Sequence, residues 1–397
     1  MVVNGTILVS SLSLLALHGT GAPQSGVRPA GAPTGTTVEP VAPQHVPSLH
    51  RLLPPQNVTL PSGEVVDFGA HEIWKPVCTT GTQVTREELE RMAATHDRLV
   101  RRPSRVIDTT PSYRIGSFNI VFNVSGTPPA GATAAIAAAE AYMESFYSDP
   151  ITITINCSFQ PLSPGVLGGT SSSYGYVDYT TTRAQIVGDM DTNVVDDTIQ
   201  AFLPSGSTCP VRYGSSSSVT NENRVFFTFA NWKAADGAVA GADASMTFST
   251  NFTFDYDPSN GITANTYSFQ DIVIHETGHA MGFTSGGDFR SRDMEVLDLF
   301  RFQGTDGSGD YNPDTTAEFQ VRPRLVRYNA PNDDHNSDLI SVEYRMSDGS
   351  PYQMSHFREQ TANIGLMDPA LAPGQTFYPA FYSTADLAMF DAIGYDY

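Results

Sequence analysis

The sequence has few positive charges. Its 397 residues include 22 Lys and Arg against 42 Asp and Glu, which gives a formal net charge of −20 and a pI near 4.6. Nucleic acids and anionic membrane surfaces attract basic proteins, so this balance argues against both as partners. Acidity of this kind keeps a protein soluble, and it does not by itself identify a substrate.

Cysteine is also scarce, with only Cys78, Cys157 and Cys209 in the chain. Three cysteines at these spacings form neither a zinc-finger pattern nor a dense disulfide framework. In an oxidising compartment we expect one disulfide, Cys157–Cys209, which would leave Cys78 unpaired. A hydrophobic core must therefore hold the fold together, and a 40% share of hydrophobic residues is ample for one.

No stretch of the sequence is long and apolar enough to cross a bilayer. Residues 7–17, ILVSSLSLLAL, are too few for a membrane span, and small residues follow them. The run is similar to the core of a secretory signal peptide, although no Lys or Arg precedes it. We expect a signal peptide within residues 1–25 and a secreted, monomeric protein without a membrane span.

The next part of the chain has the composition of a leader. Residues 20–66 are rich in Pro, Gly, Thr and Ala and lack periodicity, which is typical of a flexible linker. A helix is predicted over residues 85–100, with Thr85 and Glu88 forming a capping box. We interpret residues 26–112 as a flexible leader or pro-segment that covers the functional site. Within it, Cys78 is either a thiolate that blocks a zinc ion or simply a small hydrophobic residue.

Residues 113–397 have the alternation of strands and helices expected of an α+β domain. The order predicts helices packed on one twisted, mixed sheet. The Gly- and Ser-rich stretch 165–176 is predicted as a loop, and 294–302 as a buried strand or short helix. Strands are predicted over 117–126, 151–159, 224–231 and 244–254, and helices over 128–148, part of 181–204, the apolar run 268–274 and residues 383–397.

The segment IHETGHAMGF, residues 274–283, carries the strongest chemical signal. His275 and His279 are four positions apart, so on a helix both imidazoles project from one face and can bind one metal ion. Glu276 stands beside the first histidine, where a carboxylate can deprotonate a metal-bound water. Gly282 lets the chain turn away after the helix. The alternative is two histidines on a helix face with a neighbouring surface glutamate.

A hydrolytic zinc site needs a third protein ligand and one open position. The extended motif H-E-x-x-H-x-x-G-x-x-H places a histidine where this chain has Ser285, which is a poor zinc ligand. The third ligand must therefore come from elsewhere. The downstream candidates are Asp288, Asp293, Glu295, His335 and His356.

Three further features of the sequence go together with this motif. They are an insertion after its glycine, a distant histidine in SHFRE (355–359), and a methionine in GLMDP (365–369). Together they resemble the leishmanolysin-like metzincins. The resemblance implies a metzincin-like catalytic domain at 113–397, with an upper subdomain 113–283 and a lower subdomain 284–397 around the active cleft.

The same resemblance implies the roles of individual residues. His275, His279 and His356 would hold one Zn²⁺ ion, Glu276 would be the catalytic base, and Met367 would form a turn beneath the metal. The chain is also similar to secreted bacterial metalloproteases with HExGHxxGFTSG and SHW-type segments. It departs from these at Phe357, which replaces the tryptophan, and from some metzincins at Pro369, where they have an oxyanion-stabilising tyrosine.

These observations predict a secreted zinc endopeptidase that hydrolyses peptide bonds through a zinc-bound water activated by Glu276. Its substrates would be proteins or peptides, lying extended along an edge strand for which residues 244–254 are the candidate. Two alternatives remain: a zinc amidase acting on cell-wall or sugar amides, and a non-catalytic binding protein with a structural zinc. A Ca²⁺ site at DGSGD, residues 306–310, competes with an ordinary solvated turn.

Overall fold

The computed structural model describes most of the chain from residue 117 onwards and short segments before it. All of these residues belong to one unit, Pro47–Tyr397. The predicted signal peptide, the helix at 85–100 and the calcium candidate at 306–310 lie outside the described residues. The described ranges are 50–52, 56–59, 65–68, 71–75, 78–79, 117–190, 196–213, 218–235, 237–288, 293–303, 313, 315–326, 334–337, 343–349, 352–359 and 362–397.

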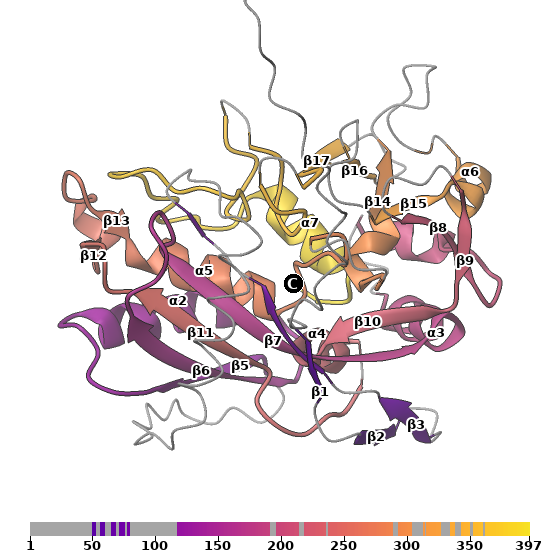
Figure 1. The fold of residues 1–397 in the computed structure, drawn as a ribbon, viewed down its shortest axis with the longest axis horizontal. Helices are drawn as coiled ribbons and strands as arrows, with labels where there is room; N and C mark the ends of the chain where they lie inside the picture. The colour runs from indigo at the N-terminus through magenta and orange to yellow at the C-terminus, as the bar shows by residue number, and fades with distance from the viewer. Residues whose placement is uncertain are drawn as a thin grey trace, which may run out of the picture. The chain divides into compact units, whose positions relative to one another are not determined.

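A mixed, seven-stranded sheet forms the larger layer of the fold (Figure 1). β11 pairs parallel with β6 and antiparallel with β7, which places it inside the sheet. The alternating burial of β5 and β6 follows their β-branched and aromatic sequences. The strands in sheet order are β1 (His50–Leu52), β4 (His71–Lys75), β7 (Gly168–Asp178), β11 (Ala244–Ser249), β6 (Thr152–Gln160) and β5 (Asn119–Val124), with β10 (Arg224–Thr228) also paired to β7.

Two helices pack together beside this sheet, the alanine-rich α2 (Ala132–Glu144) and α5 (Phe269–Ala280) (Figure 1). Every residue of α5 is buried. A helix that is covered on all sides must lie inside the protein, and α5 contacts both α2 and β7. α5 carries the metal-binding motif, so the sequence places that motif in the protein interior.

A second mixed sheet has six strands, which come from both before and after α5 in the sequence. Its β8 and β9 come from before α5 and its other strands from after it, and β8 pairs parallel with β15. Figure 1 shows β8 and β9 (pink) beside β14 and β15 (orange). The strands in order are β17 (Glu343–Met346), β16 (Asp334–Ser337), β14 (Arg301–Gln303), β15 (Arg324–Val326), β8 (Cys209–Tyr213) and β9 (Thr220–Glu222).

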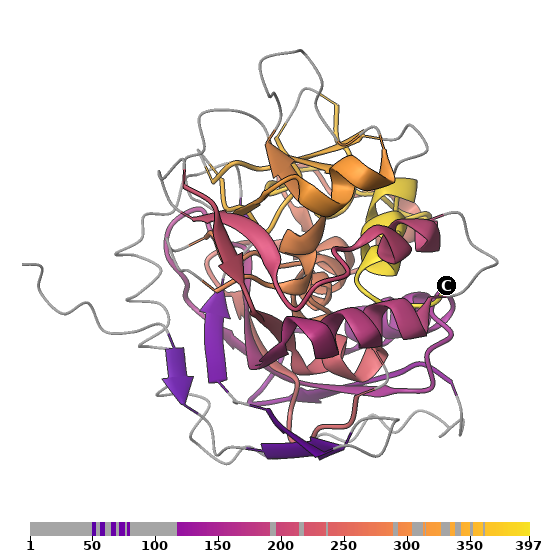
Figure 2. The same cartoon turned by 90° about the vertical axis from the view of Figure 1, so that its right-hand side faces the viewer.

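The remaining elements are short. The described residues contain six α-helices in all, and none of their helices is long and apolar enough to span a membrane. Figure 2 shows the C-terminal helix (yellow) beside the 3₁₀ helix η1. These elements are α3 (Tyr179–Asp189), η1 (Asp196–Phe202), α4 (Phe229–Ala234), η2 (Pro258–Asn260), η3 (Val296–Phe300), α6 (Thr316–Val321), α7 (Thr384–Ala392), and the strand pairs β2 (Gln56–Thr59) with β3 (Val65–Phe68) and β12 (Phe254–Asp255) with β13 (Tyr267–Ser268).

The α+β class is confirmed, and so are most of the predicted strands and helices. The helix predicted at 383–397 is α7, which Ser383 caps with Asp386 in a capping box; its Met389, Phe390 and Ile393 are buried and its Leu387 is half-buried. The expectation of a single sheet is wrong. The second sheet depends on a parallel pairing between β8 and β15, which are more than a hundred residues apart, and local periodicity carries no sign of such a pairing.

Three more expectations are corrected. Residues 165–176 do not form a loop, because most of them belong to the long strand β7. Residues 244–254 are not an edge strand, because β11 has a neighbour on both sides. The pair Cys157–Cys209 is not a disulfide, because Cys157 lies in β6 of one sheet, Cys209 lies in β8 of the other, and both are buried free thiols.

Candidate metal centre

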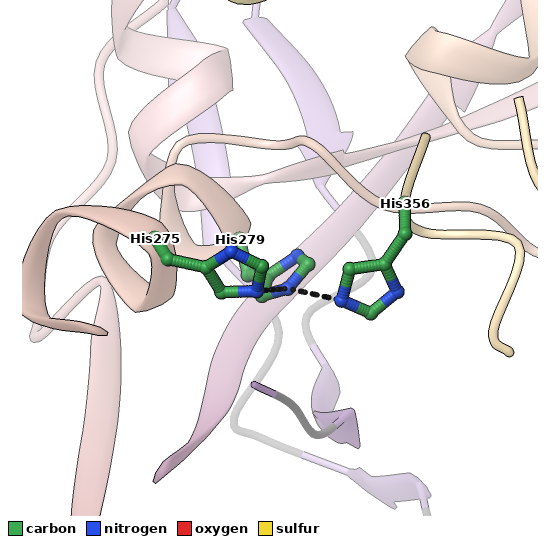
Figure 3. A group of neighbouring side chains, drawn as sticks. All are labelled: His275, His279 and His356. Atoms are coloured by element: carbon green, nitrogen blue, oxygen red, sulfur yellow. Dashed lines mark hydrogen bonds between the residues drawn. The ribbon is translucent and has the colours of Figure 1, made fainter. Parts of the chain in front are cut away.

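Three histidines converge in the interior. His275 and His279 lie on α5, and His356 comes from the segment 352–359 that follows β17 (Figure 3). The Nε2 atom of His279 is 3.1 Å from Nε2 of His275 and 3.2 Å from Nε2 of His356. Each ring is at most 2% exposed. The structure therefore brings together two histidines adjacent on one helix turn and one from 77 residues further along the chain.

The other ring nitrogens decide where the protons are. Nδ1 of His275 lies 2.8 Å from the carbonyl oxygen of Leu366, and Nδ1 of His279 lies 2.8 Å from that of Phe283. Nδ1 of His356 faces the carbonyl of Gln353 at 3.4 Å. Carbonyl oxygens only accept hydrogen bonds, so each neutral ring keeps its proton on Nδ1. All three Nε2 atoms then present lone pairs to one another.

Lone pairs at this spacing repel unless a cation lies between them. Protonation offers no relief, because burial lowers the pKa of His275 to about 4. The pKa of His356 lies well below its ordinary value. Burial is the largest cause, and the neighbouring His279 and His275 lower the pKa further. Three neutral imidazoles, oriented by carbonyls, are a donor set that suits a zinc ion. The cluster can thus hold a metal ion such as zinc.

The end of α5 supplies the carbonyl that orients His279. The helix ends at Ala280, and Gly282 has a φ of 108°, which an L-residue with a side chain rarely adopts. The reversal lets the N–H of Phe283 donate to the carbonyl of Gly278, while the carbonyl of Phe283 accepts from His279. The turn at Gly282 thus places the carbonyl that orients the ring of His279.

The turn around Met367 orients His275 in the same way. The carbonyl of Leu366 accepts from His275, and the N–H groups of Leu366 and Met367 both donate to the carboxylate of Asp386 on α7. The N–H of Phe357, next to His356, donates to the carbonyl of Met367 at 3.0 Å. One turn therefore connects the helix histidine with the distant histidine.

Asp288 is not part of the metal cluster, although it was a candidate ligand. Its carboxylate accepts the N–H groups of Met354 and Ser355 and the hydroxyl of Ser355, just before His356. Asp288 therefore acts on the site by fixing the segment that carries His356. In the part of the chain that the structure describes, the converging group contains the three histidines and no carboxylate.

The other candidates lie elsewhere. Glu295 forms a capping box with Asp298 at the start of η3 and lies 3.4 Å from the hydroxyl of Tyr174. Asp293 is outside the converging group, and His335 is in β16, whose side chains are not described. Ser285, where the extended motif has its histidine, donates to Asp298 instead. Asp298 also accepts the N–H of Glu295, so it is a hydrogen-bonded structural carboxylate.

Glu276 is fully buried beside these histidines on α5. Its Oε1 accepts the main-chain N–H of Cys78 at 2.9 Å, and its Oε2 lies 2.7 Å from the hydroxyl of Thr170 on β7. Burial raises the pKa of Glu276 to about 7, against the effect of these two hydrogen bonds. Gly168 makes room for this carboxyl, because a Cβ there would lie 3.2 Å from Oε1.

Several of these contributors were not identified from the sequence. Thr170 and Gly168 lie in the stretch 165–176, whose composition predicts a loop, and Asp386 lies in the C-terminal helix, far from the motif in sequence. The signal in the sequence was the run of small residues at 168–173, which lets β7 approach α5 closely.

Comparisons with protein-family models, with curated proteins and with solved structures found no match to this chain. No family is therefore assigned, and the similarity to metzincins remains a prediction. The histidine cluster and the contacts of Glu276 are the basis for any statement about function.

Proposed function

We propose that this protein is a secreted zinc-dependent endopeptidase. The observation that carries the proposal is the convergence of three unprotonated Nε2 atoms, two of them from the helix that also carries the buried carboxyl of Glu276. A site that only stabilises the fold has no need of that carboxyl, which is costly to bury. This argues against a non-catalytic binding protein with a structural zinc.

The metal ligands and the carbonyls that orient them have separate roles. His275, His279 and His356 would hold the ion, and Leu366, Phe283 and Gln353 keep their rings in the ligating tautomer. When bound, zinc lowers the pKa of a coordinated water and polarises the scissile carbonyl.

Glu276 would transfer the proton during hydrolysis. Its carboxylate accepts a proton from the attacking water at one oxygen and delivers it to the nitrogen of the leaving amine, as general base and then as general acid. Thr170 orients this carboxylate through its Oε2, so that Oε1 faces the position now taken by the N–H of Cys78. Burial of the helix keeps bulk water from competing for the carboxylate.

The test combines metal analysis with hydrolysis of labelled casein. A recognition sequence for a site-specific protease is inserted between Ser104 and Arg105, and activity is measured before and after the cut, because Cys78 contacts the base. We expect one zinc ion per chain and hydrolysis that a chelator abolishes. A panel of peptides and amidated glycans is assayed in parallel, and turnover of the glycans alone would favour an amidase.

Two variants separate metal binding from proton transfer. Glu276→Gln keeps the size of the side chain and should retain zinc, while hydrolysis falls by about 10²- to 10⁴-fold. His356→Ala should lose both zinc and hydrolysis. Full casein hydrolysis by Glu276→Gln would contradict the proposed role of the carboxyl.

A further inference from the structure

A strand that precedes the catalytic region in sequence covers the edge of β7. β4 pairs antiparallel with β7, with Ile73 opposite Ser172 and Lys75 opposite Thr170. Thr79 lies opposite Val166 in the same antiparallel register, four positions further along both chains. We call the described residues 71–75 and 78–79 the leader strand. It runs beside β7 past the point where β7 meets Glu276.

The end of the leader strand is held on two sides. On one side the N–H of Leu167 donates to the carbonyl of Cys78 at 3.0 Å. On the other side the N–H of Thr79 donates to the carbonyl of Pro369 at 3.3 Å, and the N–H of Leu371 donates to the carbonyl of Thr79 at 3.0 Å. Cys78 and Thr79 therefore lie as an extended main chain in a slot between the start of β7 and the segment after Met367.

The contact with Glu276 interrupts the strand pairing. In a regular antiparallel ladder the N–H of Cys78 would donate to the carbonyl of Leu167. Here that carbonyl accepts from Ser249, and the N–H of Cys78 donates to Oε1 of Glu276 at 2.9 Å. The bond uses the main chain, so any residue except proline at position 78 can make it. The sulfur of Cys78 is not in the group of atoms that converges with the three histidines.

We propose that the leader strand is a built-in occupant of a peptide-binding slot and keeps the protein latent through its main chain. The proposal rests on the proposed peptidase function. The slot consists of the edge of β7 at residues 166–173, the carbonyl of Pro369 and the N–H of Leu371. Its ligand is an extended polypeptide, which adds a strand to the sheet edge and is recognised by main-chain hydrogen bonds.

The leader strand blocks both the edge of β7, where a peptide would bind, and the carboxyl of Glu276, which would transfer the proton. While the leader strand is present, the edge of β7 has no room for a second strand, and Oε1 of Glu276 is already engaged. Displacement of the strand, for instance after a cut within residues 80–116, frees the edge and the oxygen together. The block does not depend on the thiol, in contrast to the thiolate block considered for Cys78 above.

The decisive experiment compares two variants of the zinc-loaded full chain on labelled casein. Cys78→Pro removes the N–H that engages Glu276 and keeps the carbonyl that Leu167 binds. Cys78→Ala, the matched control, keeps the N–H and removes only the sulfur. We expect Cys78→Pro to hydrolyse casein about 10-fold faster than the wild type, as expected for loss of one hydrogen bond to a charged group. Cys78→Ala should remain within about twofold of the wild type, because its main-chain contacts are unchanged.

Two results would overturn the main-chain block. Activation of Cys78→Ala to the level of Cys78→Pro would show that the sulfur is responsible. A Cys78→Pro chain no faster than the wild type, in a preparation whose cut form is active, would show that the bond to Glu276 does not restrain activity.

A binding measurement tests the slot without turnover. A labelled synthetic peptide of residues 69–81 is added to the chain cut at the inserted site, with both pieces present, and its anisotropy is followed. We expect saturable binding, equal affinity for the peptide with Ala at position 78, and about 10-fold weaker binding when the nitrogen of that residue is methylated. Equal binding of the methylated peptide would count against the slot.

The two measurements also separate the slot from the proposed function. Peptide binding without casein hydrolysis in any form would disprove the peptidase and leave the slot. Hydrolysis of casein by the cut chain without peptide binding would disprove the slot and leave the peptidase.

Discussion

At the scale of single residues, the site is built from close approaches that leave no space for an extra atom. Gly365 precedes the two N–H groups that donate to Asp386. A Cβ at this position would collide with the carboxylate of Asp386 and lie 2.5 Å from Oγ of Ser383. Both belong to the capping box of α7, and Asp386 is fully buried, so they cannot move away without breaking the capping box.

Gly365→Ala is therefore expected to displace the turn and, through Leu366, to loosen His275. We predict a loss of about 1–3 kcal/mol in the free energy of unfolding, as for other overpacked sites, together with weaker zinc binding. Chemical denaturation and a competitive zinc titration measure the two effects. Gly188→Ala, in an exposed part of α3 with nothing within 4 Å, is the control and should leave zinc affinity unchanged. Wild-type zinc affinity in Gly365→Ala would refute the connection.

At the scale of elements, α5 brings two ligands into place by itself, whereas the third depends on a segment without regular structure. His356 lies between residues held by Asp288 and a bridge from Phe357 to Met346 in β17. A buried carboxylate that accepts several main-chain N–H groups replaces the hydrogen bonds that a helix or strand would supply. Asp288 therefore has the same importance for His356 as the helix has for His275 and His279.

Asp288→Ala should leave buried donors at Met354 and Ser355 without this acceptor, and the segment should relax. We predict a fall in zinc affinity of about 10- to 100-fold, in the range seen when residues that support a metal ligand are removed. Competition with a fluorescent chelator measures it. Asp178→Ala is the matched control, because it removes the N-cap of α3 and should destabilise the fold without affecting zinc. An equal loss of zinc affinity in both variants would indicate general destabilisation.

At the scale of the whole molecule, the histidine cluster connects parts that belong to different sheets. α5 packs on β7 of the seven-stranded sheet, and the segment with His356 is bridged to β17 of the six-stranded sheet. An ion held by all three rings would cross-link these layers in the folded state only. Binding energy of that kind appears as stability, since the unfolded chain does not preserve the site.

Zinc removal should therefore lower the melting temperature. At free zinc about 1,000 times above the dissociation constant, the expected stabilisation is about 4 kcal/mol. For a protein of this size that corresponds to roughly 5–7 °C in Tm. Calorimetry with and without a chelator tests this, and His356→Ala should show little dependence on zinc. A chelator that leaves the wild-type Tm unchanged would argue against a metal at this site.

Much of this could be predicted from the sequence alone, because some signals are local. The spacing of His275 and His279 on an apolar helix, the glycine after it and the helical pattern of residues 383–397 are all signals within a few turns of the chain. The run of Gly and Ser at 165–176 was misjudged for the same reason. Its composition is that of a loop, but small residues are needed there because α5 lies directly against β7.

The amino-acid sequence by itself determined the α+β class, the helix that carries two histidines and a glutamate, and a short set of candidates for the third ligand. Only the tertiary structure decided that His356 faces this helix, that Asp288 supports it, and that the leader strand lies on Glu276. These relations join residues 67 to 198 positions apart. Their contacts arise when sheets and loops pack together, and no local pattern of residues encodes that packing.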